Sequence, residues 1–527
     1  MPRRPPWTQP AAALGGLILF VTAATPSCFA QTSETRRTSQ TAAAAYSVGV
    51  SLVYRGRRLE EAAKHLAEAV RLAPTNPDYR LALGCAFARR AVVIRRASDS
   101  AVYYKSEMTK YPTRYATWER AQSDKTSALY GAAPPTMPVR PTLADDGTKF
   151  TLDPAQAKEQ AGELGEKAMS AWDTALTACT TDAERANAQY VRGWGMIRLR
   201  RIANSFVFAQ NPAGSGSFGQ SAPWLDPNDV PSQKQVTAAF QAAADLVPEN
   251  ARYWQSLGDS FVIDGDSTAW DRPKAIAAYE KALTLDRRSP TLWYQVFSLR
   301  ERTDLPSATA ALEKAAETDS TNAYYWYLLA NLRLKSFAGN DDAENGEKAK
   351  KSSGLNAAAA PPSRDLKALA LGLDALQKGN TGTFRPVPYA YAIPKILGPL
   401  SPNYTWISTA LYDLYILILP QNVALAVKDD IGRGDTAAAV AAARTSVIFS
   451  DRIQALCEAQ SKDPGNFVIW NFSSIATNYS YSSLADALDA AGDAESAAAV
   501  RARLRVLDAV GRKRAQSQAE AFKQYGQ

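Results

Sequence analysis

The chain has 527 residues, a formal net charge of +8 at pH 7 and one histidine. This length exceeds one ordinary domain, although a solenoid escapes that limit because each repeat contacts only its neighbours. The charge is modestly basic, and a single histidine excludes a histidine-rich metal site and argues against a Ser-His-Asp triad.

The first 30 residues have the pattern of a secretory signal peptide. Arg3 and Arg4 supply positive charge, and an apolar stretch follows over 11–24. This stretch is shorter than the ~20 apolar residues that a membrane-spanning helix needs. Small residues then precede a predicted cleavage site between Ala30 and Gln31. The alternative is a helix that is not cleaved and anchors the chain.

We therefore expect an exported protein, either periplasmic or extracellular. Removing residues 1–30 takes away two arginines and lowers the formal charge from +8 to +6. The most apolar short run after them, 416–419, is stopped by Pro420, and no later segment is long enough to cross a membrane.

Two patterns of apolar residues alternate along the chain and indicate a repeat. One has residues at offsets 0, +4 and +7, at times with a proline at +12, and occurs at Ala62, Leu66, Ala69 and Pro74, at Val236, Phe240, Ala243 and Pro248, at Ala275, Tyr279 and Ala282, and at Ala308, Leu312 and Ala315. The other pattern follows it at Leu83, Gly84 and Phe87, at Trp254, Leu257, Gly258 and Phe261, at Trp293 and Val296, and at Trp326, Leu329 and Ala330.

The two patterns keep the same register. The rows that begin at Phe240 and at Trp254 both advance by 39 residues and then by 33. Offsets of 3, 4 and 7 place side chains on one face of a helix. Small residues let two helices approach closely, whereas Phe240, Tyr279 and Trp254 are expected to fill the space between hairpins. A hairpin of this size cannot bury its apolar face alone, so neighbouring hairpins must stack.

At these residues the chain resembles the tetratricopeptide repeat (TPR) family. Trp254, Leu257, Gly258 and Phe261 match the family's first helix, and Ala62 to Pro74 match its second. The resemblance covers 44–90 and 232–336. Fewer positions match over 160–203, which contains Trp172 and Trp194, and over 403–510, where Trp470 follows a helix restart.

The resemblance implies an all-α fold, a right-handed α-α superhelix (TPR-like solenoid). Loop insertions interrupt it, and one of them has the pattern of a small β-hairpin. It also implies that a peptide ligand binds the concave face formed by the first helices. One subset of the family grips a carboxylate with asparagine after the glycine. Here Val50 and Cys85 follow Gly49 and Gly84, so that role does not transfer.

The patterns divide the chain into successive segments. We expect a signal peptide over 1–30, a flexible segment over 31–43, a first array over 44–203 with an insertion at 97–154, a loop over 204–231, a central array over 232–378 with a mobile insertion at 338–363, a Pro- and Tyr-rich loop over 379–402, and divergent TPR-like helices over 403–527. The turn at Asp146 and Gly147 predicts a hairpin in the first insertion.

The Pro- and Tyr-rich loop cannot be a regular helix because proline interrupts it repeatedly. It contains Phe384, Tyr389 and Tyr391. Two interpretations remain open: the loop packs into the concave groove or shapes it, or it is a packed connector between two arrays.

Residues suited to catalysis do not gather in the sequence. His65 lies on a helix of the first repeat, where a structural or exposed role is expected. Gly214, Gly216 and Gly219 have dinucleotide-motif spacing but sit in a polar loop with no strand before them. We expect no catalytic residue, no metal site and no cofactor.

Cysteines and cationic clusters add no further site. Removing the signal leaves Cys85, Cys179 and Cys457, an odd number that implies no disulfide framework. The arginine clusters are expected to be solvated helix faces rather than a nucleic-acid site.

The sequence therefore predicts an exported, non-catalytic TPR scaffold that binds a protein or peptide partner in its concave groove. The partner and the oligomeric state do not follow from the sequence. One alternative is a cell-wall or polysaccharide-binding module, with Tyr103, Tyr104, Tyr389 and Tyr391 as stacking faces. Another is an enzyme whose site lies in the insertions or in the divergent region.

Overall fold

A computed structural model describes most of the chain. The described residues are 33–56, 58–122, 154–203, 206–209, 217–220, 231–262, 270–301, 303–337, 365–385, 394–397, 419–459 and 467–526. The predicted signal peptide, the predicted hairpin at Asp146 and Gly147, and the insertion at 338–363 lie outside them.

Helices that follow one another along the chain pack in pairs. The pairs are α1 (Ser33–Arg55) with α2 (Leu59–Leu72), α3 (Pro77–Gln122) with α4 (Pro154–Ala178), α5 (Asp182–Ala203) with α6 (Gln233–Leu246), α7 (Ala251–Ser260) with α8 (Arg272–Leu285), α9 (Pro290–Arg300) with α10 (Leu305–Thr318), and α11 (Ala323–Phe337) with α13 (Leu366–Thr381). The prediction of an all-α stack of helical hairpins is confirmed.

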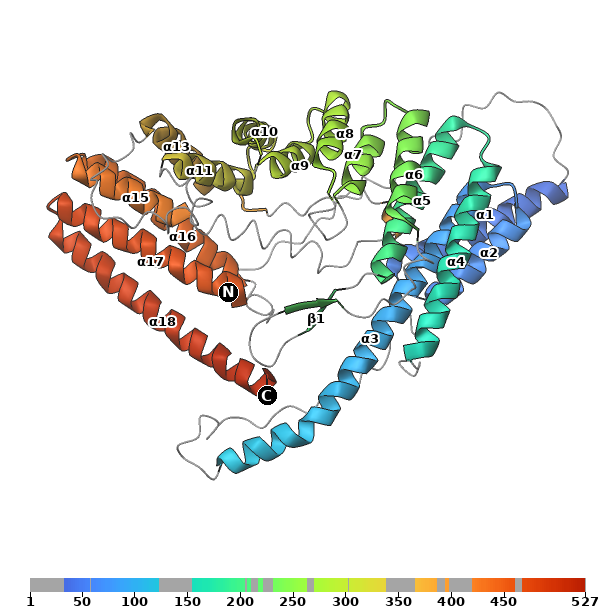
Figure 1. The fold of residues 1–527 in the computed structure, drawn as a ribbon, viewed down its shortest axis with the longest axis horizontal. Helices are drawn as coiled ribbons and strands as arrows, with labels where there is room; N and C mark the ends of the chain where they lie inside the picture. Colours follow the sequence, from blue (N-terminus) through green and yellow to red (C-terminus); the bar gives the residue numbers. More distant parts are fainter. Residues whose placement is uncertain are drawn as a thin grey trace, which may run out of the picture.

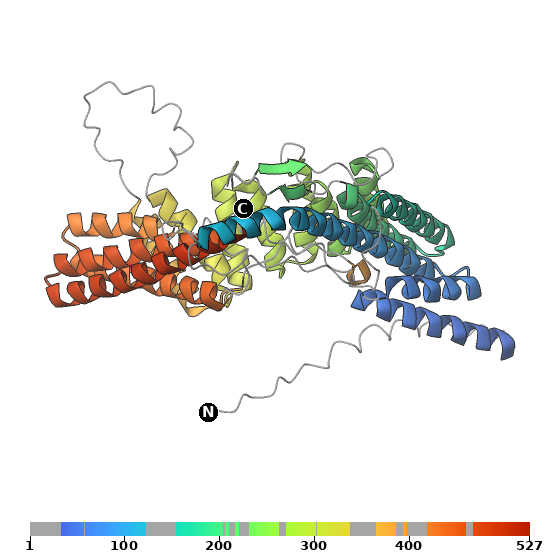
Figure 2. The same ribbon diagram turned by 90° about the horizontal axis from the view of Figure 1, so that it is seen from below.

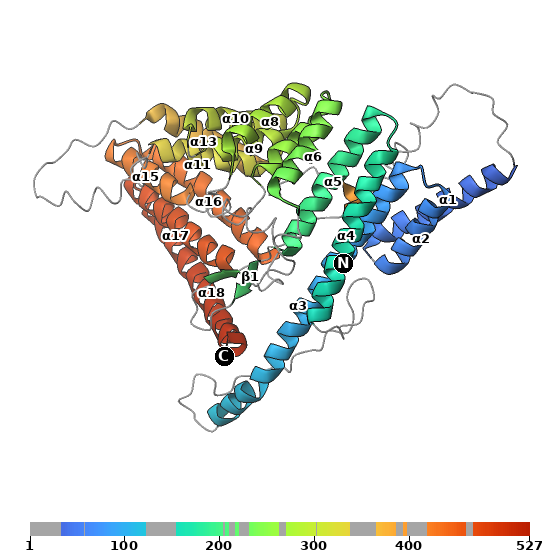
Figure 3. The same cartoon turned by 45° about the vertical axis from the view of Figure 1, so that its right-hand side comes forward.

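The hairpins form an arc. Its inner side carries α7, α9 and α11, and its outer side carries α8, α10 and α13 (Figure 1). One end of the arc continues into α15 (Leu419–Gly432), α16 (Thr436–Ala459), α17 (Phe467–Ala490) and α18 (Ala494–Gly526), which pack side by side (Figure 3). Viewed from below, these helices and the α1–α2 hairpin occupy opposite ends of an elongated molecule (Figure 2).

Polar residues just before the helices explain where they begin. Ser232 and Gln235 form a capping box before α6, because each side chain bonds the other residue's backbone N–H. Asn250 accepts from the N–H of Arg252 at 3.1 Å before α7. Asp304 accepts from the N–H of Ser307 at 3.1 Å before α10. These oxygens satisfy donors that the first helical turn leaves unpaired.

Two turns in the C-terminal helices share one Gly-Asp design. Gly434 and Gly492 adopt φ values of 80° and 82°, the left-handed region that glycine enters without steric cost. The aspartates that follow, Asp435 and Asp493, accept from backbone N–H groups three residues later and so begin α16 and α18. This geometry accounts for the Arg-Gly-Asp tripeptide at 433–435 as a turn between helices.

Close approach within hairpins depends on glycine facing a large ring. A Cβ added at Gly258 on α7 would lie 2.5 Å from Cε1 of Tyr279 on α8, and one added at Gly193 on α5 would lie 2.7 Å from Cε1 of Phe240 on α6. Real side chains do not pack at such distances. Glycine at these positions therefore sets the spacing of the two helices.

The structure departs from the predicted segments in three places. The segment that was expected to be flexible over 31–43 is helical from Ser33, where α1 begins. Residues expected in the loop over 204–231 form an antiparallel pair, β1 (Phe206–Ala209) and β2 (Ser217–Gln220), so the expectation of a plain loop is wrong there. In the first insertion, α3 continues as a helix to Gln122 and protrudes from the arc (Figure 1). Within the described residues, no helix combines the length and apolar character needed to cross a membrane.

Candidate binding surface on the inner face

The repeat residues chosen from the sequence occupy three kinds of position. Those that are buried are Ala62, Leu66, Ala69, Gly84, Phe240, Ala243, Leu257, Gly258, Ala275, Tyr279, Ala282 and Trp326. Those that are half-buried against the core are Leu83, Phe87, Trp254, Phe261 and Trp293. The prolines at 74 and 248 are exposed just after the ends of α2 and α6. The side chain of Trp470 lies outside the described residues.

The half-buried tryptophans pack against the core clusters and also bond the turn that precedes their own helix. The indole N–H of Trp254 donates to the carbonyl of Pro248 at 2.9 Å, and that of Trp293 donates to Arg287 at 3.1 Å. Trp326 repeats the bond to a carbonyl six residues earlier. Each accepting carbonyl lies in the turn just beyond the C-cap of the preceding helix, so the bond ties that turn to the helix that follows it. In α3 the guanidinium of Arg80 takes this role.

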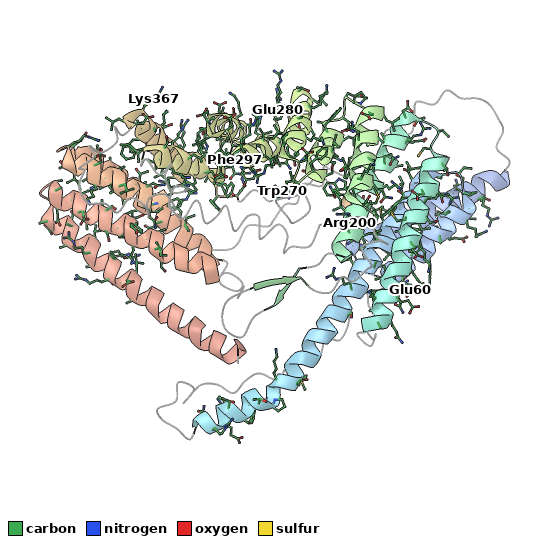
Figure 4. The ribbon with its side chains drawn as sticks, in the orientation of Figure 1. Glu60, Arg200, Trp270, Glu280, Phe297 and Lys367 are labelled. Atoms are coloured by element: carbon green, nitrogen blue, oxygen red, sulfur yellow. The ribbon has the colours of Figure 1, made fainter. Side chains whose placement is uncertain are left out.

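Ion pairs join successive hairpins where the family pattern would have an aromatic. Arg300 on α9 contacts Glu280 on α8 at 2.5 Å, and Arg333 on α11 contacts Glu313 on α10 at 2.5 Å. Both arginines lie seven residues after the tryptophan of their helix. Glu280, on α8, and Glu60, on α2, are labelled in Figure 4, and Glu60 makes the related contact to Arg90 of α3.

Buried hydrogen bonds join four central helices, α5, α7, α8 and α9. The hydroxyl of Tyr279 donates to Oδ1 of Asp259 at 2.8 Å, and Nε2 of Gln295 donates to the same oxygen at 3.1 Å. The indole of Trp194 donates to Oγ of Ser256 at 3.1 Å. Asp259, Ser256 and Gln295 have no exposed surface. Because buried polar groups specify geometry when they are bonded, this network fixes α5, α7, α8 and α9 relative to one another.

The residues directly after α13 lie on the start of α11 in extended form. Thr383 bridges Asn322 in parallel. The N–H of Ala323 donates to the carbonyl of Thr383 at 3.0 Å, and the N–H of Thr383 donates to the carbonyl of Thr321 at 2.8 Å. The chain here binds the array as an added strand binds a sheet edge, through its main chain.

A later part of the same Pro- and Tyr-rich segment packs against the opposite end of the array. The 3-10 turn η3 (Lys395–Leu397) contacts α1 and α3. Leu397 is fully buried, and Ile396 packs between the core clusters of the first hairpins. The chain then returns to α15, which packs on α11. The described ends of this segment therefore dock on two distant hairpins; Tyr389 and Tyr391 lie outside the described residues.

An open cavity of about 390 Å³ lies between α3 and α4. Its lining includes the apolar side chains of Leu83 and Phe87 and the charged side chains of Arg80, Glu166 and Lys167. Arg80 occupies the position that tryptophan holds in α7, α9 and α11, which leaves this part of the first array less filled.

The described residues hold no group of three His, Cys, Asp or Glu side chains placed to bind a metal. The side chain of His65 is 39% exposed and lies 3.8 Å from Glu61 on the same helix. Cys85 and Cys179 are buried free thiols. Burial raises the pKa of Cys85 to about 12, which keeps this thiol protonated at neutral pH.

Comparisons with known proteins yield similar solved structures only. No family model matches the sequence, and the search of curated proteins gives no match. A structure of Pseudomonas aeruginosa pilF is 16% identical, covers 60% of this chain and 93% of its own, and has a TM-score of 0.30. Yeast Tom70 is 13% identical, covers 90% of this chain and 99% of its own, and has a TM-score of 0.23. The description of the fold therefore rests on the helices of this chain.

Proposed function

We propose that the protein is an exported, non-catalytic TPR-like scaffold that holds a protein or peptide partner on the inner face of its arc. The observation that supports this most is the docking of Thr383 on Asn322, in the turn where α11 begins. There an extended polypeptide is held on the array by main-chain hydrogen bonds. First helices that stand side by side can offer such positions along the whole arc.

Site-specific cross-linking tests this proposal. A photoreactive amino acid replaces Gln255, a half-buried residue of α7 that contacts Gln295 of the next first helix. The matched control places it at Lys314, an exposed residue of the outer helix α10. In envelope extract, a discrete cross-linked protein is expected from position 255 and not from 314. Cross-links from 314 alone, or from neither position, contradict binding on the inner face.

Export requires its own measurement. Mass spectrometry of the protein recovered from its native cells should find an N-terminus at Gln31 and locate the chain outside the cytoplasm. Recovery of the protein from the cytoplasm with residues 1–30 attached would refute export.

A polysaccharide is a second candidate ligand because aromatic rings line the protruding part of α3. The ring centroids of Tyr111 and Tyr115 lie 6.0 Å apart, and those of Tyr115 and Trp118 lie 5.4 Å apart. Spacings of four and three residues place them on one helical face. Sedimentation with isolated wall material should weaken when Trp118 is replaced by alanine; unchanged sedimentation, or none by the parent chain, removes this candidate.

A further inference from the structure

We infer that residues 382–385 are an internal ligand of the inner face, and that the surface they cover accepts an external peptide with the same pattern, a glycine followed by any residue, an aromatic and an arginine. This inference rests on the proposed function and names the kind of partner. Each of the four residues contributes a separate contact.

Gly382 and Thr383 provide the main-chain part of the recognition. A Cβ at Gly382 would lie 2.9 Å from the carbonyl oxygen of Thr321 and 3.1 Å from the nitrogen of Ala323, so no side chain fits at this position. The N–H of Thr383 then donates to the carbonyl of Thr321, and its carbonyl accepts from the N–H of Ala323. Its side chain is exposed, which makes the site tolerant of other residues there.

Phe384 and Arg385 provide the side-chain part. The ring of Phe384 lies edge-on to Tyr324 at 5.8 Å and close to Tyr327 at 6.1 Å, and both tyrosines are buried. Arg385 donates to Oδ1 of Asp319 at 3.0 Å and to the hydroxyl of Thr321 at 2.7 Å. The rings of Tyr324 and Tyr327 favour an aromatic residue at the position of Phe384, and the carboxylate of Asp319 favours a cation at the position of Arg385.

The docked residues lie on the surface rather than in the core. Phe384 is half-buried, whereas Thr383 and Arg385 are exposed. The tyrosines beneath them belong to the main core cluster and pack against other helices, Tyr327 against Phe449 at 4.8 Å. Residues 383–385 therefore lie at the edge of the core cluster, on which Phe384 packs, and the inference requires an incoming peptide to displace them.

The test uses a labelled peptide with the sequence of residues 380–387 and the full-length chain. The parent protein should bind the peptide weakly, because its own segment occupies the site. The double variant F384A/R385A should bind it at least tenfold more tightly, as followed by fluorescence anisotropy. A peptide with alanine at the positions of Phe384 and Arg385 is the matched ligand control and should not bind.

Adding Asp319→Ala to the double variant should lower peptide affinity again by about tenfold. Equal peptide binding to the parent and the double variant, or no binding to either, overturns the inference. A dimer formed by exchange of residues 382–385 between two copies would be detected by sedimentation and would also overturn it. Because Arg385 is exposed, the single variant Arg385→Ala is expected to fold. Hydrogen exchange of the Thr383 amide should be faster in this variant than in the parent. An unchanged exchange rate counts against the inference. Cross-linking at Gln255 is independent of these results.

Discussion

Glycines opposite aromatic rings set how closely the two helices of a hairpin approach. Gly193 faces Phe240, and Gly258 faces Tyr279, whose hydroxyl also bonds the buried Asp259. Where a first helix carries a large residue instead, its partner is smaller: Phe297 of α9, labelled in Figure 4, is buried in a hairpin whose second helix offers Leu312. In successive hairpins the larger of the two facing side chains thus comes from the second helix or from the first, so that the space between the helices is filled in each case.

Gly193→Ala should destabilise the chain by about 1–2 kcal/mol. Overpacking against Phe240 costs about 1–3 kcal/mol, and the helix preference of alanine offsets about 0.5–1 kcal/mol of it. The double variant Gly193→Ala with Phe240→Leu should lose less unfolding free energy than the sum of the two single losses, by at least about 0.5 kcal/mol. Urea unfolding followed by circular dichroism measures all three variants; strictly additive losses would show that the two residues do not share this space.

Trp254→Phe should cost about 1 kcal/mol. It keeps an aromatic ring at this half-buried position but removes the N–H that donates to the carbonyl of Pro248. The urea midpoint relative to the parent measures the loss. A loss of several kcal/mol would mean that Trp254 stabilises the chain mainly through its packing against the two core clusters and not through this bond.

Helix starts depend on carboxylates and hydroxyls that accept backbone N–H groups. Asp304 is such a residue before α10, and its bonds to Ser307 lower its pKa below the usual value of 3.8. A carboxyl whose pKa is lowered by folding stabilises the folded state fully at pH values above its pKa in the unfolded chain. This stabilisation is lost as the pH falls through its pKa in the folded chain.

Asp304→Asn should therefore change the pH dependence of stability in one direction. Asparagine also caps helices but carries no titrating group. The parent should be the more stable of the two at pH 7, because a negative charge favours a helix N-terminus. This advantage should begin to fall near pH 3.8 and vanish once the pH is below the lowered pKa of the folded protein. Melting temperatures of both proteins between pH 7 and pH 2.5 measure the difference. A difference in melting temperature that stays constant between pH 7 and pH 2.5 would show that the charge of Asp304 does not stabilise the start of α10.

At the scale of the whole molecule, local patterns predict the hairpins but not what lies on them. The periodic rows determine which faces pack, because they depend on residues within one or two turns. The contact between Phe384 and Tyr324 joins residues 60 positions apart, and no periodic pattern in the sequence predicts it. The pair of Arg333 with Glu313 was detectable, since both this pair and Arg300 with Glu280 are 20 residues apart. The strand pair in 204–231 lacked alternating residues on which a prediction could rest.

The central claim is that the inner face of the array holds extended polypeptide, and amide hydrogen exchange of the full-length chain tests it most directly. The N–H groups of Ala323 and Thr383 should be protected together, because they bond each other's segments. Phe384→Ala should release both while leaving the amides of the α7–α8 hairpin unchanged. Exchange of Thr383 in the parent chain at the rate of an unstructured peptide would contradict the claim.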